Sequence, residues 1–251
     1  ATGVHASMSA EAVNEWGWRL PFILGGLFGF VTMYLRRWLH ETPVFTEMQE
    51  RQQLAEELPI KTVVKDHLPS VTISMAVTWV LTAAIVVTIL MTPALLQKMA
   101  GLDPQQSLEA NSLAIVALFI GCVISGSLAD RFGNGPIMAI FSVGLAISYA
   151  VFFSLMLNDT SLLFVLYPVV GFFAGLVGVV PSIAVKSFPA AIRFTGLSFS
   201  YNLAYAIFGG TTPLVVSMLL GYNPLAPVYY VSAVAVIGVI ASLAVIRFRR
   251  Q

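Results

Sequence analysis

Residues 70–96 read SVTISMAVTWVLTAAIVVTILMTPALL, a run of 27 residues without a charged side chain. An α-helix needs about 20 mostly apolar residues to cross the hydrocarbon core of a bilayer. The run lacks the alternation of apolar and polar residues that marks a strand of a membrane barrel. It therefore predicts a helix that spans a membrane.

Six further segments of the chain have the same character. They are residues 20–35, 111–129, 136–157, 161–185, 194–220 and 225–246. The first of them is short unless the preceding Gly17, Trp18 and Arg19 extend it. The sequence thus predicts an all-α transmembrane protein with seven spanning helices.

The composition excludes most other classes of protein. Of the 251 residues, 58% are apolar and only 10% are charged, with a net charge of +1 and a mean hydropathy of +0.87. A soluble domain carries about 25% charged residues, so neither a soluble enzyme nor a nucleic-acid-binding protein is expected. Cys122 is the one cysteine, which excludes an internal disulfide and a cysteine-based metal site. We expect no enzyme activity, no cofactor and no metal.

The basic side chains predict an orientation, because Lys and Arg near the ends of spans favour the cytoplasmic side. Two of the 13 fall on one side of the predicted membrane, Arg19 and Lys98. The other eleven fall on the opposite side: Arg36, Arg37, Arg51, Lys61, Lys65, Arg131, Lys186, Arg193, Arg247, Arg249 and Arg250. The C-terminus is therefore predicted to be cytoplasmic and the N-terminus outside. A chain that begins outside without a signal peptide predicts an odd number of further helices before Ala1.

The polar stretch 36–69 holds more than a third of all charges. Thr42 and Pro43 resemble an N-cap and a first-turn proline, and apolar residues follow at helical spacing as far as Leu58. Residues 60–68 form a second amphipathic piece. We expect both to be helices that lie on the membrane surface, although a partly ordered linker is the alternative.

No Asp, Glu, Lys, Arg or His lies inside any predicted span. This argues against a self-contained proton pump, a retinal protein or a membrane-embedded protease, each of which needs ionisable groups at membrane depth. Uncharged polar residues are present instead. Ser74, Thr78 and Thr82 share one helix face beside Trp79, and a second group lies within 194–220, namely Tyr201, Asn202 and Tyr205. These groups line a cavity, bond to a neighbouring helix or bond back to their own backbone.

Small residues and prolines predict close packing and interrupted helices. Gly171, Gly175 and Gly178 have a spacing that lets two helix backbones approach, and Pro181 follows them. Gly209 and Gly210 precede Pro213 in the next span. Interrupted helices at membrane depth are typical of proteins with an internal cavity.

Residues 126–135 read GSLADRFGNG. This resembles the G-x-x-x-D-R-x-G-R-R signature of the major facilitator superfamily, in which glycines allow a tight turn, the Asp neutralises a helix N-terminus and the Arg pairs with it. Asn134 and Gly135 depart from the basic residues of that pattern. Residues 17–22 (GWRLPF), 188–196 (FPAAIRFTG) and 208–213 (FGGTTP) are similar to the metabolite:proton symporters, which include carriers for proline and betaine, shikimate, citrate and α-ketoglutarate.

The resemblance implies a major-facilitator-type helical bundle in which the seven spans are the sixth to twelfth helices of a twelve-helix carrier. Residues 1–16 would be an outer loop and 17–37 the last helix of an incomplete N-terminal six-helix half. Residues 38–69 would be the central cytoplasmic loop and 70–251 the C-terminal six-helix half. The implied location is the inner (plasma) membrane, with the lipid bilayer and the N-terminal half of the carrier as partners.

The implied function is secondary active transport of a small organic metabolite, a carboxylate or a zwitterion, by proton-coupled symport and alternating access. The implied substrate-facing residues are Ser74, Thr78, Trp79 and Thr82, followed by Tyr167, Asn202 and Tyr205. The implied gating residues are Gly126, Asp130, Arg131, Gly133 and Arg193.

Two alternatives remain open at this stage. The chain could be a truncated fragment of such a carrier that transports nothing. It could also be a seven-span receptor or sensor, although the signature-like turn, the lack of outer-loop cysteines and the long loop after the first span argue against this.

Overall fold

The computed structural model describes residue 12 and residues 15–36 and 59–248. The chain divides into two units, residues 1–54 and 55–251, and each is described here by itself. In the first unit a short 3-10 helix, η1 (Gly17–Arg19), leads into α3 (Leu20–Leu35), which has Pro21 in its first turn and no buried side chain. The predicted outer loop (apart from residues 12, 15 and 16), and the predicted surface helix up to Leu58, lie outside the described residues.

The second unit contains six helices that are long and apolar enough to cross a membrane. Their bounds are Leu68–Ala100, Pro104–Phe132, Asn134–Met156, Leu163–Lys186, Ala190–Leu220 and Ala226–Ile246. These confirm six of the seven predicted spans. The remaining predicted span, residues 20–35, corresponds to α3, which is apolar but has only 16 residues.

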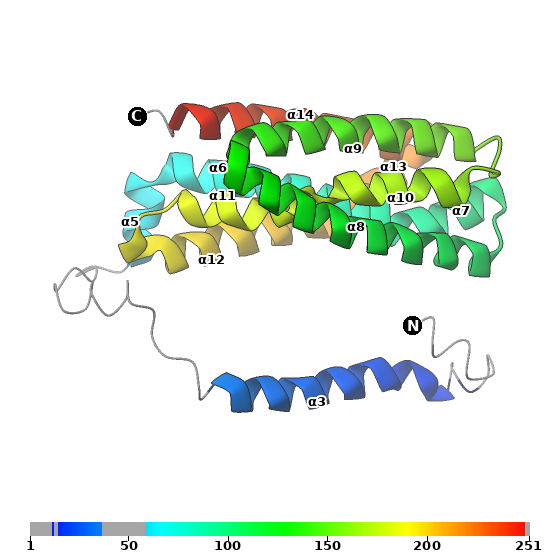
Figure 1. Ribbon diagram of the computed structural model, residues 1–251, viewed down its shortest axis with the longest axis horizontal. Coiled ribbons are helices and arrows are strands. Elements are labelled where there is room, and N and C mark those ends of the chain that lie inside the picture. The colour runs from blue at the N-terminus through cyan, green and yellow to red at the C-terminus, as the bar shows by residue number, and fades with distance from the viewer. Residues whose placement is uncertain (1–11, 13–14, 37–58, 249–251) are drawn as a thin grey trace. The chain divides into compact units, whose positions relative to one another are not determined.

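The six helices run lengthwise side by side (Figure 1). The first consists of α6 (Leu68–Thr82), the π-helical η3 (Ala83–Met91) and α7 (Thr92–Ala100); α8 (Pro104–Phe132) and α9 (Asn134–Met156) are continuous. The fourth consists of α10 (Leu163–Ala174), η4 (Gly175–Gly178) and α11 (Val180–Lys186). The fifth consists of η5 (Ala190–Ile192), α12 (Arg193–Ala204), the π-helical η6 (Tyr205–Gly209) and α13 (Gly210–Leu220), and the last is α14 (Ala226–Phe248).

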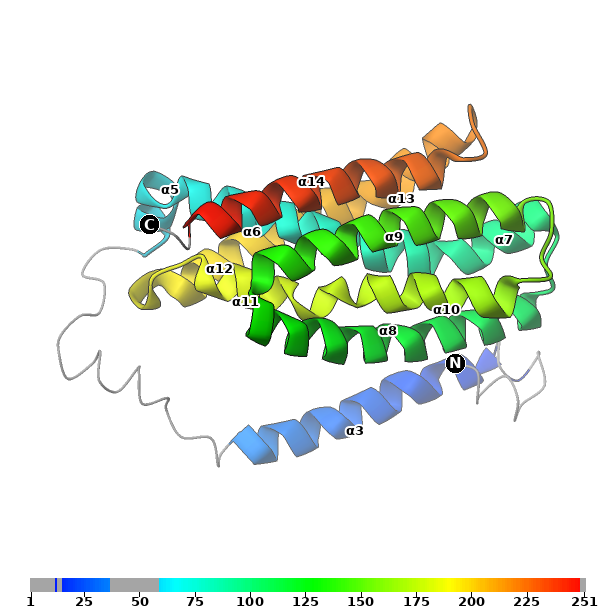
Figure 2. The same cartoon turned by 45° about the horizontal axis from the view of Figure 1, so that its top comes forward.

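The helices of this unit pack mainly in pairs. Helix α8 packs against α10, and α9 packs against α14, as two views of the bundle show (Figures 1 and 2). Helix α6 contacts both α12 and α14. Large apolar side chains also cover the outside of the bundle, where Phe119 is 67% exposed and Val165 is 62% exposed. An apolar exterior of this kind suits lipid rather than water.

Glycines explain how closely α8 and α10 approach. A Cβ built on Gly171 would lie 2.0 Å from the carbonyl oxygen of Ala114, and one built on Gly175 would lie 2.3 Å from the carbonyl carbon of Gly121. No side chain fits at such distances, so the backbones touch only because these positions are glycine. The predicted close packing is confirmed.

Each interruption lies shortly before a proline. The π-helical η3 ends two residues before Pro93, η6 ends four residues before Pro213, and the 3-10 turn η4 ends three residues before Pro181. Proline has no backbone N–H, and its ring clashes with the carbonyl four residues earlier. The Thr92 N–H accordingly donates to the carbonyl of Val87, five residues back.

Part of the polar stretch before α6 is helical, as predicted. The helix α5 (Pro59–Asp66) buries Val63 against Val71, Phe188 and Ile192, while Lys61 and Lys65 are exposed. The predicted helix is therefore confirmed for residues 59–66, although Val64 and Leu68 of the predicted apolar face are exposed, and its location on a membrane surface stays a prediction.

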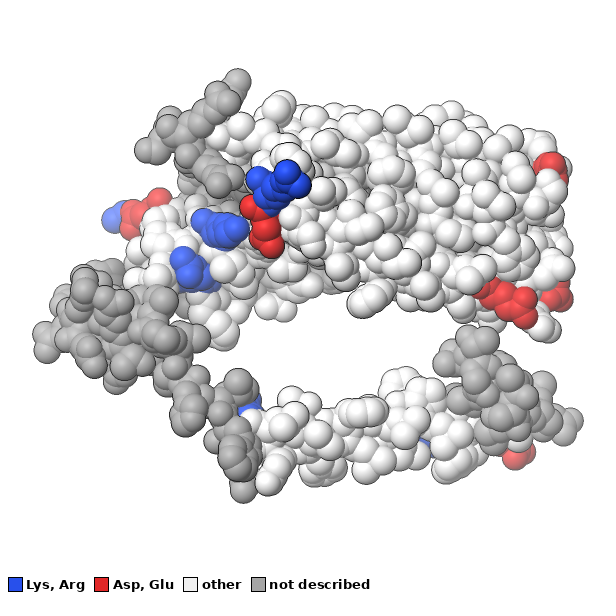
Figure 3. All heavy atoms as spheres, viewed as in Figure 1, with Lys and Arg blue, Asp and Glu red and all other residues white. Residues whose placement is uncertain are grey.

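Charged side chains gather at the two ends of the second unit (Figure 3). The described charges at one end are Lys61, Lys65, Asp66, Asp130, Arg131, Lys186 and Arg193. Those at the other end are Lys98, Asp103, Glu109 and Asp159. The excess of basic residues at one end agrees with the predicted grouping, although its cytoplasmic orientation remains a prediction.

Candidate functional site

The two π-helical segments lie halfway along neighbouring helices. The segment η3 contains the midpoint of the helix Leu68–Ala100, and η6 begins at Tyr205, which is equally far along the chain from Ala190 and Leu220. Helix α6 contacts η6, and η3 contacts α13. We call this region the mid-helix junction, and it forms the first candidate site.

The hydroxyl face of α6 turns toward α12. The helix is continuous over Leu68–Thr82, so Ser74, Thr78 and Thr82, spaced four residues apart, share one face as predicted, and all three are fully buried. The Thr78 hydroxyl donates to the Ser74 carbonyl oxygen over 2.7 Å, and the Thr82 hydroxyl donates to the Thr78 carbonyl oxygen over 2.8 Å. The Ser74 and Ser200 hydroxyl oxygens lie 2.7 Å apart. These hydroxyls therefore bond to backbone and to a neighbouring helix, and their predicted contact with a substrate stays a prediction.

Trp79 lies beside this face and joins three elements. Its indole Nε1–H donates to the Tyr230 hydroxyl of α14 over 2.9 Å, and that hydroxyl also bonds to the Thr212 hydroxyl of α13. The Trp79 ring stacks on Phe208 of η6, with centroids 4.0 Å apart and planes 4° apart. The sequence does not predict these contacts of Tyr230, Thr212 and Phe208, although Phe208 and Thr212 lie in the family-like stretch 208–213.

Tyr205 completes the junction. Its ring lies 4.8 Å from the ring of Tyr201, measured between centroids. A Cβ built on Gly209 would lie 3.3 Å from Tyr205 Cδ1 and 3.8 Å from Thr82 Cγ2, so these two predicted residues flank the same glycine. Asn202 is exposed, and its amide Nδ2–H donates to the Ser198 carbonyl oxygen over 2.7 Å. The structure thus brings Trp79, Thr82 and Tyr205 together.

Tyr167 lies elsewhere, in the interior among α8, α9 and α10. It is fully buried, and its ring stacks on Phe152 with centroids 4.8 Å apart. Its hydroxyl lies 2.8 Å from the Thr88 carbonyl oxygen and 2.7 Å from the Asn111 side-chain oxygen. Tyr167 therefore ties the π-helical η3 to α8 and α10.

The second candidate site is the turn between α8 and α9, where the predicted gating residues lie. Gly133 has φ +94° and ψ 153°, a backbone conformation that favours glycine strongly, and its N–H donates to the Ala129 carbonyl oxygen over 2.8 Å. The turn can therefore end α8 at Phe132 and start α9 at Asn134. At Gly126, by contrast, a built Cβ would meet no heavy atom within 4 Å beyond its chain neighbours and the backbone of its own helix.

The charged residues of this turn are exposed. Asp130 and Arg131 follow one another on α8, so their side chains point in different directions, and the structure has no ion pair between them. The Arg131 guanidinium instead lies 5.3 Å from the centroid of the Phe132 ring. The Arg193 Nε–H donates to the Phe188 carbonyl oxygen over 3.2 Å. The expected pairing of Asp130 with Arg131 is therefore not observed.

The two residues that depart from the signature make specific contacts. The Asn134 amide Nδ2–H donates to the Ser182 hydroxyl of α11 over 3.0 Å. A Cβ built on Gly135 would lie 2.5 Å from Ile246 Cγ1 and 3.0 Å from the Ser242 carbonyl oxygen, both of α14. The turn is thus fastened to α11 by an amide and to α14 by close packing.

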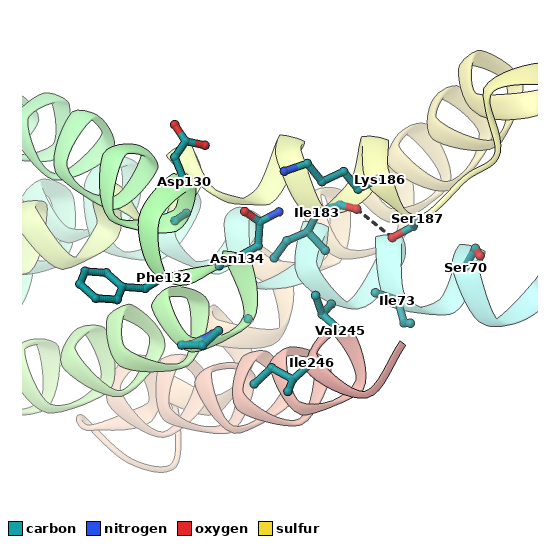
Figure 4. A pocket seen from close by; sticks show the side chains of 14 residues that line it. Ser70, Ile73, Asp130, Phe132, Asn134, Ile183, Lys186, Ser187, Val245 and Ile246 are labelled. Carbon is teal, nitrogen blue, oxygen red and sulfur yellow. Dashed lines mark hydrogen bonds between the residues drawn. The ribbon is translucent and has the colours of Figure 1, made fainter. Parts of the chain in front are cut away.

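A cavity of about 920 Å³ opens beside this turn (Figure 4). Helices α6, α11 and α14 line it together with the turn, and Asp130, Asn134 and Lys186 are its polar residues from the turn and α11. Among the described residues no cluster of three His, Cys, Asp or Glu side chains could hold a metal ion.

The comparison with known families now identifies the class of protein. Residues 6–197 match the model of the Major Facilitator Superfamily. The chain belongs to this superfamily of membrane transporters, which are not enzymes.

Relatives at low identity have names that refer to small metabolites. A Staphylococcus aureus protein that carries the name of a proline/betaine transporter is 29% identical over 236 residues, covering 92% of this chain and 50% of its own length. The citrate-proton symporter of Klebsiella pneumoniae is 29% identical over 246 residues, covering 95% of this chain and 54% of its own. The glycine betaine/proline/ectoine/pipecolic acid transporter OusA of Dickeya dadantii is 29% identical over 249 residues, covering 93% and 49%. The chain spans about half the length of these relatives, and no solved structure matches it significantly.

Proposed function

We propose that residues 1–251 form the C-terminal portion of a secondary active transporter that carries a small organic metabolite together with protons. The family and the names of the relatives support this class of activity. The observation that carries the proposal is the mid-helix junction, where two interrupted helices meet halfway along their lengths. Transporters of this architecture bind substrate near the bilayer midplane, on helices that are interrupted there.

In this proposal the junction forms one wall of the substrate cavity. Trp79 and Tyr205 supply aromatic surface, and Thr82 supplies a hydroxyl that is already bonded to its own helix. Rotation of the C-terminal half against the N-terminal half would expose this wall to each side of the membrane in turn. The interruptions before Pro93 and Pro213 let the helices bend at the same level.

The group that binds the coupled proton is proposed to lie outside this wall. The described charges of the second unit fall near helix ends or in the segments between helices, and none lies at the mid-helix junction. A proton-coupled carrier needs an ionisable group at membrane depth. That group would therefore come from the N-terminal half of the carrier.

The turn between α8 and α9 is proposed to hold the cytoplasmic side closed in one state. Gly133 fixes the turn, and the contacts of Asn134 and Gly135 fasten it to α11 and α14. The exposed Asp130 and Arg131, with Arg193 at the start of α12, would then act together on the opposing half.

Uptake measurements test the proposed function. Bacteria without their own uptake of proline, glycine betaine and citrate would express the reading frame that contains residues 1–251. We expect uptake of at least one radiolabelled compound, and we expect a protonophore to abolish it. Absence of uptake above a vector control, with the protein present in the membrane fraction, contradicts the proposal. The 251-residue chain expressed alone tests whether this portion transports without the rest, and uptake by it excludes the inactive-fragment alternative.

A further inference from the structure

Four aromatic side chains gather at the mid-helix junction. They are Trp79, Tyr201, Tyr205 and Phe208, which we call the aromatic wall. Trp79 stacks on Phe208 at 4.0 Å, and Tyr201 lies 4.8 Å from Tyr205. All four rings are half-buried, so each keeps part of its surface exposed. Aromatic faces carry partial negative charge and attract cations.

The hydrogen-bond donors that join Trp79 to its neighbours are already used within the protein. The Thr212 hydroxyl donates to the Phe208 carbonyl oxygen, so the Tyr230 hydroxyl donates to Thr212. Tyr230 in turn accepts the indole N–H of Trp79. This chain of bonds ends on a backbone carbonyl and leaves neither the indole N–H nor the Tyr230 and Thr212 hydroxyls for a carboxylate.

The wall also lacks formal positive charge. The described Lys and Arg side chains of the second unit belong to the ends of its helices, with Lys98 near one end and Lys186 and Arg193 near the other. A ligand with several carboxylates would meet no cation here, and burying unpaired negative charge is costly. An ammonium group, by contrast, would gain from the exposed rings.

We propose that the aromatic wall binds the ammonium group of a zwitterionic substrate and thereby selects zwitterions over polycarboxylates. The inference rests on the proposed function and specifies the substrate class of the same site. The carboxylate of the zwitterion is bound by the opposing half of the carrier. Tyr230 acts as a positioning residue, because its hydroxyl fixes the orientation of the Trp79 ring.

A pair of isosteres tests the charge preference. Glycine betaine and 3,3-dimethylbutanoate have nearly the same shape, but the second has a neutral carbon in place of the quaternary nitrogen. Each would compete, in the full-length carrier, with uptake of whichever radiolabelled compound the carrier takes up. We expect glycine betaine to compete at least about tenfold better than the isostere, and citrate to compete weakly.

Variants assign this preference to the wall. We expect Trp79→Leu and Phe208→Leu each to reduce the preference for glycine betaine about tenfold, and Trp79→Phe to keep part of it. Tyr230→Phe keeps the Trp79 side chain but removes the hydroxyl that orients its ring, and it should therefore weaken the preference. The control is Tyr229→Leu, which removes an exposed aromatic ring from the next position on α14 and should leave the preference unchanged.

The outcomes separate the inference from the function on which it rests. If no compound is taken up, the proposed function fails and the inference fails with it. If uptake occurs but the isostere or citrate competes as well as glycine betaine, the inference alone is overturned. The same holds if Trp79→Leu, folded and active, keeps the full preference.

Discussion

The hydroxyl oxygens of Ser74 on α6 and Ser200 on α12 lie 2.7 Å apart, and both side chains are fully buried. The pair connects two elements that lie 126 residues apart in the chain. Its two members differ in their other partners. Ser200 Oγ also lies 2.7 Å from the Gly196 carbonyl oxygen, whereas Ser74 Oγ has no second partner among the described residues.

This difference predicts unequal effects of two alanine substitutions. Ser200→Ala leaves the buried Ser74 hydroxyl unpaired and should lower the free energy of unfolding by about 1–3 kcal/mol. Ser74→Ala leaves Ser200 bonded to its own helix and should cost about 1 kcal/mol or less. Chemical denaturation in detergent micelles measures both, and equal losses would contradict the assignment of partners.

Glycine-to-alanine substitutions should show which glycines are required for contact between helices. Gly171→Ala and Gly175→Ala place a methyl group against the backbone of α8 and should lower stability by about 1–3 kcal/mol or more. Gly126→Ala is the matched control, because a Cβ there meets no heavy atom within 4 Å. Thermal unfolding measured by the loss of monodisperse protein compares the three. Alanine favours a helix more than glycine does, so Gly126→Ala should not lower stability, and a loss as large as the others would contradict the assignment to helix packing.

The two glycines with positive φ should respond differently to asparagine. Gly101 has φ +64° and ψ 23°, the left-handed conformation that asparagine tolerates. Gly133 has φ +94° and ψ 153°, which only glycine adopts readily. We expect Gly133→Asn to lower stability by about 1–3 kcal/mol and Gly101→Asn to change it by less than about 1 kcal/mol. Thermal unfolding again provides the measurement.

The proposed gate predicts a transport defect for a neutralised carboxylate. Asp130→Asn should lower the maximal rate of uptake about tenfold, because loss of one charge-assisted hydrogen bond costs about 1.5–3 kcal/mol. Glu109→Gln, an exposed carboxylate near the opposite end of α8, is the control. Uptake by Asp130→Asn at the unaltered rate would remove the residue from the gate.

The segment between α9 and α10 predicts a dependence on acid pH. The backbone N–H and hydroxyl of Ser161 both donate to the Asp159 carboxylate over 2.9 Å and hold the pKa of that carboxyl below its ordinary value. Because the folded-state pKa is lowered, the stabilisation is present at neutral pH and is lost as the pH falls through the lowered pKa. Ser161→Ala should raise the pKa toward the ordinary value of about 3.9, as NMR titration of the carboxyl carbon can show. An unchanged titration would contradict the role of Ser161.

The sequence predicts the helices well because span length and apolar composition are local properties. The bounds of residues 70–96 and 111–129 differ from the observed helices chiefly at the ends, where polar residues such as Gln97 and Glu109 continue the helix beyond the apolar core. The spacing of Ser74, Thr78 and Thr82 likewise predicts their common face correctly. Such periodicity does not reveal what the face contacts.

Contacts between distant residues could not be predicted in this way. Trp79 and Tyr230 are 151 positions apart, and no local pattern connects them. Tyr167 occupies an apolar run like other interior residues, and only the packing of α8, α9 and α10 shows that it bonds to Thr88 and Asn111. The prolines correctly predict that helices are interrupted. Whether the turn before a proline becomes 3-10 or π-helical depends on which carbonyl oxygen accepts each backbone N–H, and this is not visible in the sequence.

The π-helical turns η3 and η6 have a mechanical consequence. A wide turn holds one residue more than an α-helical turn does. If the wide turn moves by one position along the helix, the residue that it passes rotates by about 100° about the helix axis. Both extra residues lie halfway along neighbouring helices, so a shift in one helix would change the surface against which the other packs. The interior of the bundle would then change shape while its outer surface stays unchanged.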